Sequence, residues 1–289
     1  MRVRRASPAG LTLPFLGGEK NSQMEDTMST ATTTLQIDLT GKRALVTGGT
    51  RGIGKGIADR LRAAGATVVV VARSAPRTPS PQVVTADIAT ADGSATIAER
   101  TLAILGGVDI VVHNVGGSQV GPASLINLTD DDWHQAFQTN LLGAVRLDRA
   151  LVPSMIAGRS GVIIHITSVQ RRQPLPGTAP YAAAKAALAN YSKALSDELA
   201  PNGIRVNSVC PGFIETEAAA AFANQHAAAL QISTDAARAQ IIESIGGIPL
   251  GRTGDPTDVG DLVAFLVSDH ARYLTGTEYL IDGGSTRGV

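Results

Sequence analysis

The chain has 289 residues, with 25 basic and 25 acidic side chains and a single cysteine. This balanced charge gives no support for a surface that binds nucleic acid or an anionic membrane, and aromatic residues, at 3%, are too few for base-stacking platforms. No apolar run reaches the roughly 20 residues that a bilayer span needs. One cysteine excludes an internal disulfide and fits a reducing cytoplasm. We therefore expect a cytoplasmic globular protein with no nucleic-acid or membrane partner.

Residues 1–34 differ from the rest of the chain. They combine basic residues with a short apolar patch that is broken by Pro14 and by glycines, which is too interrupted for a convincing signal peptide. We interpret them as a disordered N-terminal extension, or as translation from an upstream start, with Met24 and Met28 as alternative starts. Residues 35–289 are expected to form one domain.

A glycine-rich turn follows the first predicted strand. The strand is Arg43–Thr47 (RALVT), the turn is GGTRGIG, and the helical stretch KGIADRLRAAG comes next. This order of strand, glycine turn and helix is the context in which glycines serve phosphate binding, because the helix N-terminus presents free backbone amides. Gly48, Gly52 and Gly54 are the candidates for three roles: a tight turn, a close approach of the backbone to the pyrophosphate, and close packing of the helix against the strand.

The end of the second predicted strand, Thr67–Ala72, indicates which dinucleotide is bound. An NAD site needs an acidic residue there to hold the ribose 2′-hydroxyl. The sequence instead reads Ala72-Arg73-Ser74. Arg73, together with Arg51 in the glycine turn, could pair with a 2′-phosphate, since guanidinium groups match phosphate oxygens. The sequence therefore favours NADP(H) over NAD(H); solvated surface arginines are the alternative.

Strands continue to alternate with helices along the chain. Further strands are predicted at 82–86, 108–114, 161–167, 203–209 and 277–281. This alternation predicts an α/β fold: a single Rossmann-type, doubly wound parallel sheet of about seven strands with helices on both faces. The alanine-rich stretch at about 212–250 is the least sheet-like part, and we expect it to form a mobile helical lid over the strand ends.

Several polar residues have a structural interpretation beside a functional one. His113 lies inside a strand and is more typical of a core histidine than of a catalytic one, and the other histidines show no metal-ligand spacing, so no metal is predicted. Cys210 ends an apolar run and is expected to be a buried structural thiol. For Asn140, which lies among apolar residues, structural and functional roles remain open.

Tyr181 and Lys185 are four residues apart on a predicted helix, Tyr181–Leu199, so their side chains share one face. A nearby ammonium is expected to lower the pKa of a phenol. Ser168 closes the preceding strand, 13 residues before the tyrosine. Taken alone, the pair is more typical of an exposed helical pair. Arg171 and Arg172 follow Ser168 and are expected to be solvated rather than to bind an acidic substrate.

Together these segments resemble the short-chain dehydrogenase/reductase family, of the classical type. The resemblance covers residues 39–289 and rests on an ordered set: TGGTRGIG at 47–54, Asp87, HNVG at 113–116, Asn140, Ser168, Tyr181-x-x-x-Lys185 and Pro211-Gly212. One departure is HNVG, where the family usually has NNAG.

The resemblance implies hydride transfer between NADP(H) and a carbonyl or secondary alcohol, as in a ketone or 3-oxoacyl reductase. It assigns Asn140, Ser168, Tyr181 and Lys185 to a catalytic tetrad in which Tyr181 is the general acid/base. The implied cofactor contacts are Gly48, Thr50, Arg51, Gly52, Ile53, Gly54, Arg73, Asp87, Ile88, Asn114, Val115, Gly116, Tyr181, Lys185, Pro211, Gly212, Ile214 and Thr216. A small-molecule substrate and a homo-oligomer, tetramer or dimer, are also implied. The alternatives are an NAD-dependent alcohol or steroid dehydrogenase and a non-catalytic dinucleotide-binding sensor.

Overall fold

A computed structural model describes residues 36–75, 80–117 and 124–286. From Ile37 onward the chain forms one compact unit. The expected extension at residues 1–34 lies outside the described residues, as does the segment 118–123 of the loop that follows Gly117. Within the described ranges, no helix has the length and apolarity needed to cross a membrane.

The core of this unit is a parallel sheet, which confirms the predicted fold class. In the described residues it has seven strands, in the order β3-β2-β1-β4-β5-β6-β7, and each neighbouring pair is parallel. The strands are β1 (Arg43–Thr47), β2 (Thr67–Ala72), β3 (Val83–Thr85), β4 (Ile110–His113), β5 (Gly161–Ile166), β6 (Ile204–Pro211) and β7 (Glu278–Ile281).

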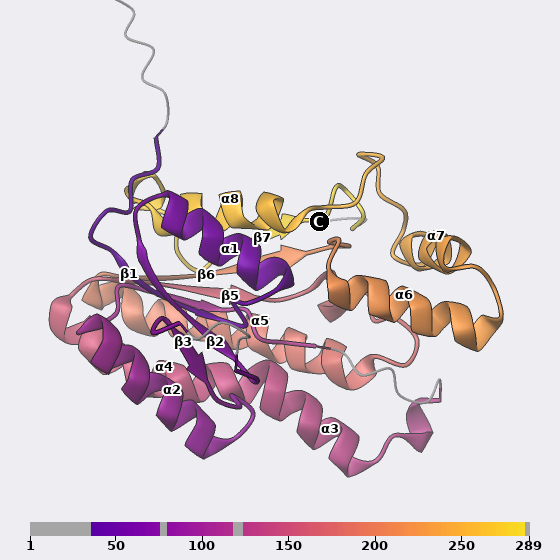
Figure 1. Ribbon diagram of the computed structural model, residues 1–289, viewed down its shortest axis with the longest axis horizontal. Coiled ribbons are helices and arrows are strands. Elements are labelled where there is room, and N and C mark those ends of the chain that lie inside the picture. Colours follow the sequence, from indigo (N-terminus) through magenta and orange to yellow (C-terminus); the bar gives the residue numbers. More distant parts are fainter. Residues whose placement is uncertain (1–35, 76–79, 118–123, 287–289) are drawn as a thin grey trace, which may run out of the picture. The chain divides into compact units, whose positions relative to one another are not determined.

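Helices cover both faces of the sheet (Figure 1). One face carries α1 (Gly52–Ala63) and α8 (Pro256–Val267), and the other carries α2 (Ala91–Leu105), α4 (Gly143–Gly158) and α5 (Ala179–Leu199). Each layer has its own apolar core. Ile57 and Val263 are fully buried on the first face, and Ile97 and Leu147 on the second. Because both faces are covered, the strands are near-continuous apolar runs rather than alternating ones.

The remaining helices form the ends of the domain. Thr129 and Asp132 make a capping box at the start of α3, which buries no residue fully and leaves Trp133 36% exposed. The helices are α3 (Asp130–Phe137), α6 (Glu217–Leu230) and α7 (Thr234–Ser244), the π-helix η2 (Gln138–Leu142), and the 3₁₀ turns η1 (Leu125–Asn127), η3 (Val169–Arg171), η4 (Ala200–Asn202) and η5 (Asp269–Ala271).

The strand order places a ligand crevice between β1 and β4. The chain adds β2 and β3 on one side of β1 and then crosses to add β4 on the other side. In open α/β sheets, ligands bind at the carboxyl ends of the strands where this reversal occurs. The glycine turn, Asn114 and Ser168 all follow such ends.

Candidate active site

The turn after β1 requires glycine at two positions. Gly48 has a φ of +67°, which is in the left-handed region. A Cβ at Gly54 would lie 2.2 Å from the carbonyl oxygen of Gly48, closer than any side chain tolerates. These contacts hold the first turn of α1 against the end of β1, which is what a phosphate-binding turn needs.

The N-terminus of α1 has no side-chain cap. Its N-cap residue, Arg51, makes no side-chain capping bond, and the first turn contains no acidic residue. The amides of that turn therefore have no intrahelical partner and suit an anion such as a pyrophosphate. Thr216, which caps α6, lies beside this turn, since a Cβ at Gly52 would be 3.2 Å from its Cγ2.

The end of β6 leads the chain to that threonine. The amide of Gly212 donates to the carbonyl of Ile281 (3.0 Å), and Ile214 pairs with Gly254 as an isolated bridge. Three of the predicted contacts, Pro211, Gly212 and Ile214, thus form the bend between β6 and α6. They set the position of Thr216.

Asn114 joins the ends of β4 and β1. Its side-chain amide donates to the carbonyl of Thr47 (3.0 Å), and the Thr47 hydroxyl accepts from the backbone amides of Asn114 (2.9 Å) and Val115 (3.0 Å). Asn114 therefore ties the ends of β4 and β1 together.

Two further predicted contacts lie at the end of β3. Asp87 is exposed and accepts a hydrogen bond from the amide of Ala89 (3.0 Å). Ile88 is 3% exposed, and Gly143 on α4 packs against it, since a Cβ there would be 2.9 Å from its Cγ1. The Ile88 side chain therefore belongs to the core, and only its backbone remains for a ligand.

Arg51 and Arg73 follow neighbouring strands at the same edge of the sheet. β1 and β2 are paired up to Thr47 and Val71, and both arginines are exposed. Within the described ranges neither arginine makes an ion pair. Two unpaired guanidinium groups at this edge suit a phosphate.

Tyr181 and Lys185 share one face of α5, as the spacing predicted. The Lys185 ammonium lies 5.9 Å from the centre of the Tyr181 ring and donates to the carbonyl of Ile166 at the end of β5 (2.7 Å). Ser168 comes two residues later, and its hydroxyl interacts with the Tyr181 phenol. The Ser168 oxygen also accepts from the amide of Gln170 (3.2 Å).

Asn140 reaches the same place from the π-helix η2. It is 2% exposed, accepts from the amide of Gly117 (3.1 Å) and donates to the carbonyl of Ala136 (3.0 Å). A Cβ at Gly116 would lie 2.8 Å from the Lys185 nitrogen and 2.9 Å from the Asn140 side-chain oxygen. All four tetrad residues therefore meet at the ends of β4 and β5.

Burial dominates the protonation of the two titratable groups. It lowers the pKa of Lys185 to about 8. It raises the pKa of Tyr181, while the Ser168 hydroxyl acts in the opposite direction. The direction for Tyr181 is opposite to the one expected from the neighbouring lysine, because desolvation penalises a buried phenolate.

A buried ion pair lies just behind this group, and the sequence reasoning missed it. Arg171 pairs with Glu278 on β7, and both side chains are mostly buried. Thr167 also donates to Glu278 (2.8 Å). The expectation that Arg171 is solvated was therefore wrong: β7 supplies a carboxylate from the far end of the chain. Cys210 is fully buried, as expected, and burial raises the pKa of its thiol.

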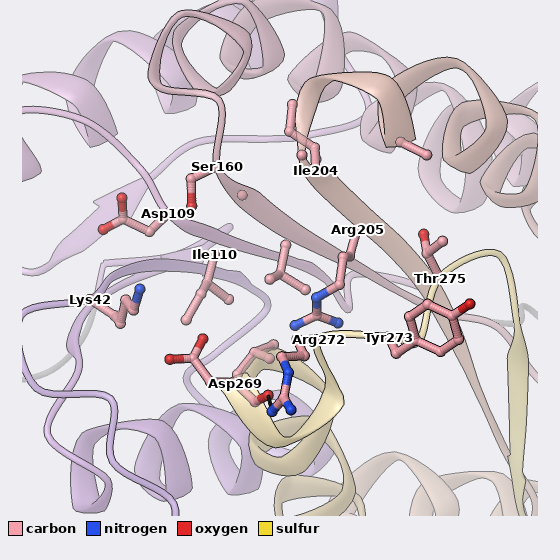
Figure 2. Close-up of a pocket in the computed structure, with 15 residues that line it drawn as sticks. Lys42, Asp109, Ile110, Ser160, Ile204, Arg205, Asp269, Arg272, Tyr273 and Thr275 are labelled. Atoms are coloured by element: carbon pink, nitrogen blue, oxygen red, sulfur yellow. Dashed lines mark hydrogen bonds between the residues drawn. The ribbon is translucent and has the colours of Figure 1, made fainter.

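A cavity of about 510 Å³ lies at the opposite edge of the sheet, at the amino ends of β4, β5 and β6 (Figure 2). Lys42, Arg205 and Arg272 line it. Arg205 donates to the carbonyls of Leu274 (3.2 Å) and Ser268 (3.3 Å), so it satisfies backbone acceptors of the segment between α8 and β7. None of the tetrad residues lines this cavity, which is therefore separate from the candidate active site.

Comparisons with known proteins agree with this geometry. A family model described as enoyl-(acyl carrier protein) reductase matches residues 48–286. Oxidoreductase UcpA of Escherichia coli (strain K12) is 36% identical over 259 residues, which cover 86% of this chain and 95% of the relative. The 3-oxoacyl-[acyl-carrier-protein] reductase FabG of Haemophilus influenzae is 36% identical over 252 residues, covering 84% and 98%.

The chain belongs to the short-chain dehydrogenase/reductase family. This confirms the resemblance read from the motifs. Among solved structures of similar proteins, L-sorbose reductase from Gluconobacter frateurii, complexed with NADPH and L-sorbose, superposes with a TM-score of 0.80 at 29% identity and covers 88% of this chain and 100% of that one. As a short-chain dehydrogenase/reductase, the chain is an oxidoreductase that uses a nicotinamide dinucleotide.

Proposed function

We propose that the protein is an NADP(H)-dependent reductase of a ketone or 3-oxoacyl substrate, with Tyr181 as the general acid. The observation that carries this proposal is the meeting of Ser168, Tyr181, Lys185 and Asn140 at the carboxyl ends of β4 and β5, beside the uncapped N-terminus of α1. The dinucleotide supplies the hydride, and the glycine turn and Thr216 would hold its phosphates.

The chain's own residues handle the proton. The Ser168 hydroxyl, which contacts the Tyr181 phenol, would turn to donate a hydrogen bond to the substrate oxygen and so orient the carbonyl. Tyr181 would then transfer its proton to the same oxygen. Because burial raises the pKa of Tyr181, the phenol is protonated at neutral pH, as an acid in the reducing direction must be. Asn140 would hold a water that links Lys185 to solvent.

The preference for NADP(H) rests on Arg51 and Arg73, which lie unpaired, within the described residues, beside the predicted ribose site. The structural relative from Gluconobacter frateurii contains NADPH, which agrees with this proposal. An NAD-dependent alcohol or steroid dehydrogenase is the second candidate. No acidic residue follows β2 to bind the ribose 2′-hydroxyl, so the preference between NADP(H) and NAD(H) depends on these two arginines.

The substrate is proposed to lie under α6 and α7, which occupy the stretch predicted as a lid at 212–250. FabG relatives are named for 3-oxoacyl-[acyl-carrier-protein] and the structural relative for L-sorbose. Both substrates carry a carbonyl, so a ketone panel that includes a 3-oxoacyl thioester and a ketose covers the proposed class. We also propose that the protein acts in the cytoplasm as a homodimer or homotetramer.

Tyr181→Phe tests the proposed function. The variant keeps the ring and removes the proton, so kcat for NADPH-dependent ketone reduction should fall about 100-fold or more, while NADPH binding, measured by fluorescence titration, stays unchanged. Tyr273→Phe is the matched control, because that ring is 99% exposed at the opposite edge of the sheet.

Activity of Tyr181→Phe within about threefold of the wild type would contradict the acid role. If the wild type binds NADPH but reduces none of the ketones, the non-catalytic sensor becomes the better interpretation.

A further inference from the structure

A buried carboxylate on α4 accepts hydrogen bonds from three other side chains. Asp148 is 2% exposed. One oxygen is 2.7 Å from Nε2 of His113, and the other is 3.3 Å from Nε2 of His165 and 3.0 Å from the hydroxyl of Tyr191, which donates to it. A carboxylate without partners is costly to bury, so these three bonds make its burial possible.

The three donors come from the elements that carry the active site. His113 is the last residue of β4 and immediately precedes Asn114. His165 lies on β5, three residues before Ser168. The two histidines are opposite each other in the register of β4 and β5, and their rings stack 4.9 Å apart.

Tyr191, the third donor, and Asp148, the acceptor, lie on two further elements of the active site. Tyr191 lies on α5, six residues after Lys185. Asp148 lies on α4, which continues directly from the π-helix that carries Asn140. Every element that delivers a tetrad residue is therefore bonded to one carboxylate. His113 is a core histidine, as expected, and it shares its carboxylate partner with His165 and Tyr191.

Hydrogen bonding describes this cluster better than metal coordination does. His113, Asp148 and His165 each offer a ligand atom, and these atoms lie within 4.8 Å of one another. However, the two rings are nearly parallel, 10° apart, and each Nε2 is in hydrogen-bond distance of the carboxylate rather than directed at a common point. Direct hydrogen bonds from the two rings to the carboxylate therefore account for the cluster.

The protonation pattern follows from the partners. The pKa of Asp148 is lowered by its two histidine partners despite burial, so the residue is a carboxylate at neutral pH. Burial lowers the pKa of His165, which is therefore neutral. His165 then donates through Nε2 to Asp148 and accepts at Nδ1 from the hydroxyl of Ser192 on α5 (3.0 Å).

We propose that Asp148 is a positioning residue for the active site. It sets β4, β5 and α5 relative to α4 in the arrangement that brings Ser168, Tyr181 and Lys185 together. Its removal would leave two buried histidines and the half-buried Tyr191 hydroxyl without this acceptor, and the elements would shift to find new partners. A shift of about 1 Å at the tetrad is enough to slow a proton transfer strongly. The kinetic part of this inference rests on the proposed function.

Asp148→Asn tests the proposal because it keeps the shape and removes the charge and part of the acceptor capacity. We expect kcat for NADPH-dependent ketone reduction to fall about tenfold or more, with the Kd for NADPH and the KM for the ketone changed less than about threefold. Tyr191→Phe, which removes one donor and retains the ring, should lower kcat in the same way but less.

Ser196→Ala is the matched control. Ser196 is 1% exposed on α5, the helix of Tyr191, and among the described residues its hydroxyl bonds only to the carbonyl of Lys193 within that helix (2.7 Å). This variant loses a buried hydrogen bond without loosening a tie between elements, so its kcat should equal that of the wild type. In the double variant Asp148→Asn/Tyr191→Phe, kcat should be no lower than in Asp148→Asn, because both changes act through one carboxylate.

Backbone hydrogen exchange provides a readout that needs no turnover. In Asp148→Asn, amides at 113–117 and 165–169 should exchange faster than in the wild type, and those in Ser196→Ala should not. If Asp148→Asn melts below the assay temperature, kcat and backbone hydrogen exchange of Tyr191→Phe test the proposal instead.

Unchanged exchange and unchanged kcat in a folded variant would overturn the proposal, and so would a lower Tm with kcat unchanged. If the wild type shows no Tyr181-dependent turnover, the proposed function is wrong. The positioning role of Asp148 is then tested by backbone hydrogen exchange alone.

Discussion

At the scale of single residues, burial controls the chemistry of the candidate site more than neighbouring charge does. Lys185 is 2% exposed and retains one carbonyl partner, so its charged form is penalised. The same desolvation raises the pKa of Tyr181 although an ammonium is near. Neither effect is contained in the four-residue spacing, which only places both groups on one helical face.

Lys185 should make folding stability depend on pH in a specific direction. Its pKa falls from an ordinary value of 10.5 to about 8 on folding. The unfolded chain therefore binds more protons between these values, and stability rises with pH across that window. Below pH 8 the charged lysine costs about 3 kcal/mol, and this cost disappears above pH 10.5.

The free energy of unfolding of Lys185→Met, measured by urea denaturation, should therefore exceed that of the wild type by more at pH 7 than at pH 10.5. Lys193→Met, an exposed lysine on the same helix, serves as the baseline. The prediction would be contradicted if the difference in free energy of unfolding between Lys185→Met and the wild type did not change with pH.

At the scale of elements, local pattern predicted the strands well and their ends less well. β2 is an uninterrupted β-branched run, and its predicted and observed bounds coincide. β6 continues to Pro211, two residues beyond the predicted end, because Cys210 and Pro211 pair with β7. The π-helix at Asn140 was not predicted, since no apolar period distinguishes it from the α-helices on either side.

The end of β2 carries the prediction at this scale. Arg73→Ala should raise the Kd for NADPH about 10- to 100-fold, because a charge-assisted bond to the 2′-phosphate is lost. The Kd for NADH should be unchanged. Arg100→Ala, an exposed arginine on α2, is the control. Equal weakening of both dinucleotides, measured by fluorescence titration, would show that Arg73 does not read the 2′-phosphate.

At the scale of the whole molecule, the sheet ends in an incompletely covered strand. Within the described residues β7 pairs only with β6, and Leu280 on β7 is 43% exposed. An unpaired edge with an exposed apolar side chain invites pairing with a second copy. This feature agrees with the homo-oligomer that we propose.

Leu280→Lys should weaken that assembly, because a charge on an edge strand opposes pairing. In analytical ultracentrifugation the wild type should sediment as a dimer or tetramer of the 29.7 kDa chain, and Leu280→Lys at a lower mass. Leu230→Lys, on α6 and 49% exposed, is the control for added charge. A monomeric wild type at micromolar concentration would contradict the prediction.

The order of strands and helices, the glycine turn and the Tyr181–Lys185 pair could be read from the sequence alone, because each is determined by residues that are close in the chain. Apolar period, steric freedom at glycine and helical spacing are local properties. Only the tertiary structure decided that Arg171 meets Glu278, and that Asp148 joins two strands and α5 through shared hydrogen bonds. Such pairs depend on how distant elements pack, and burial then sets their charge.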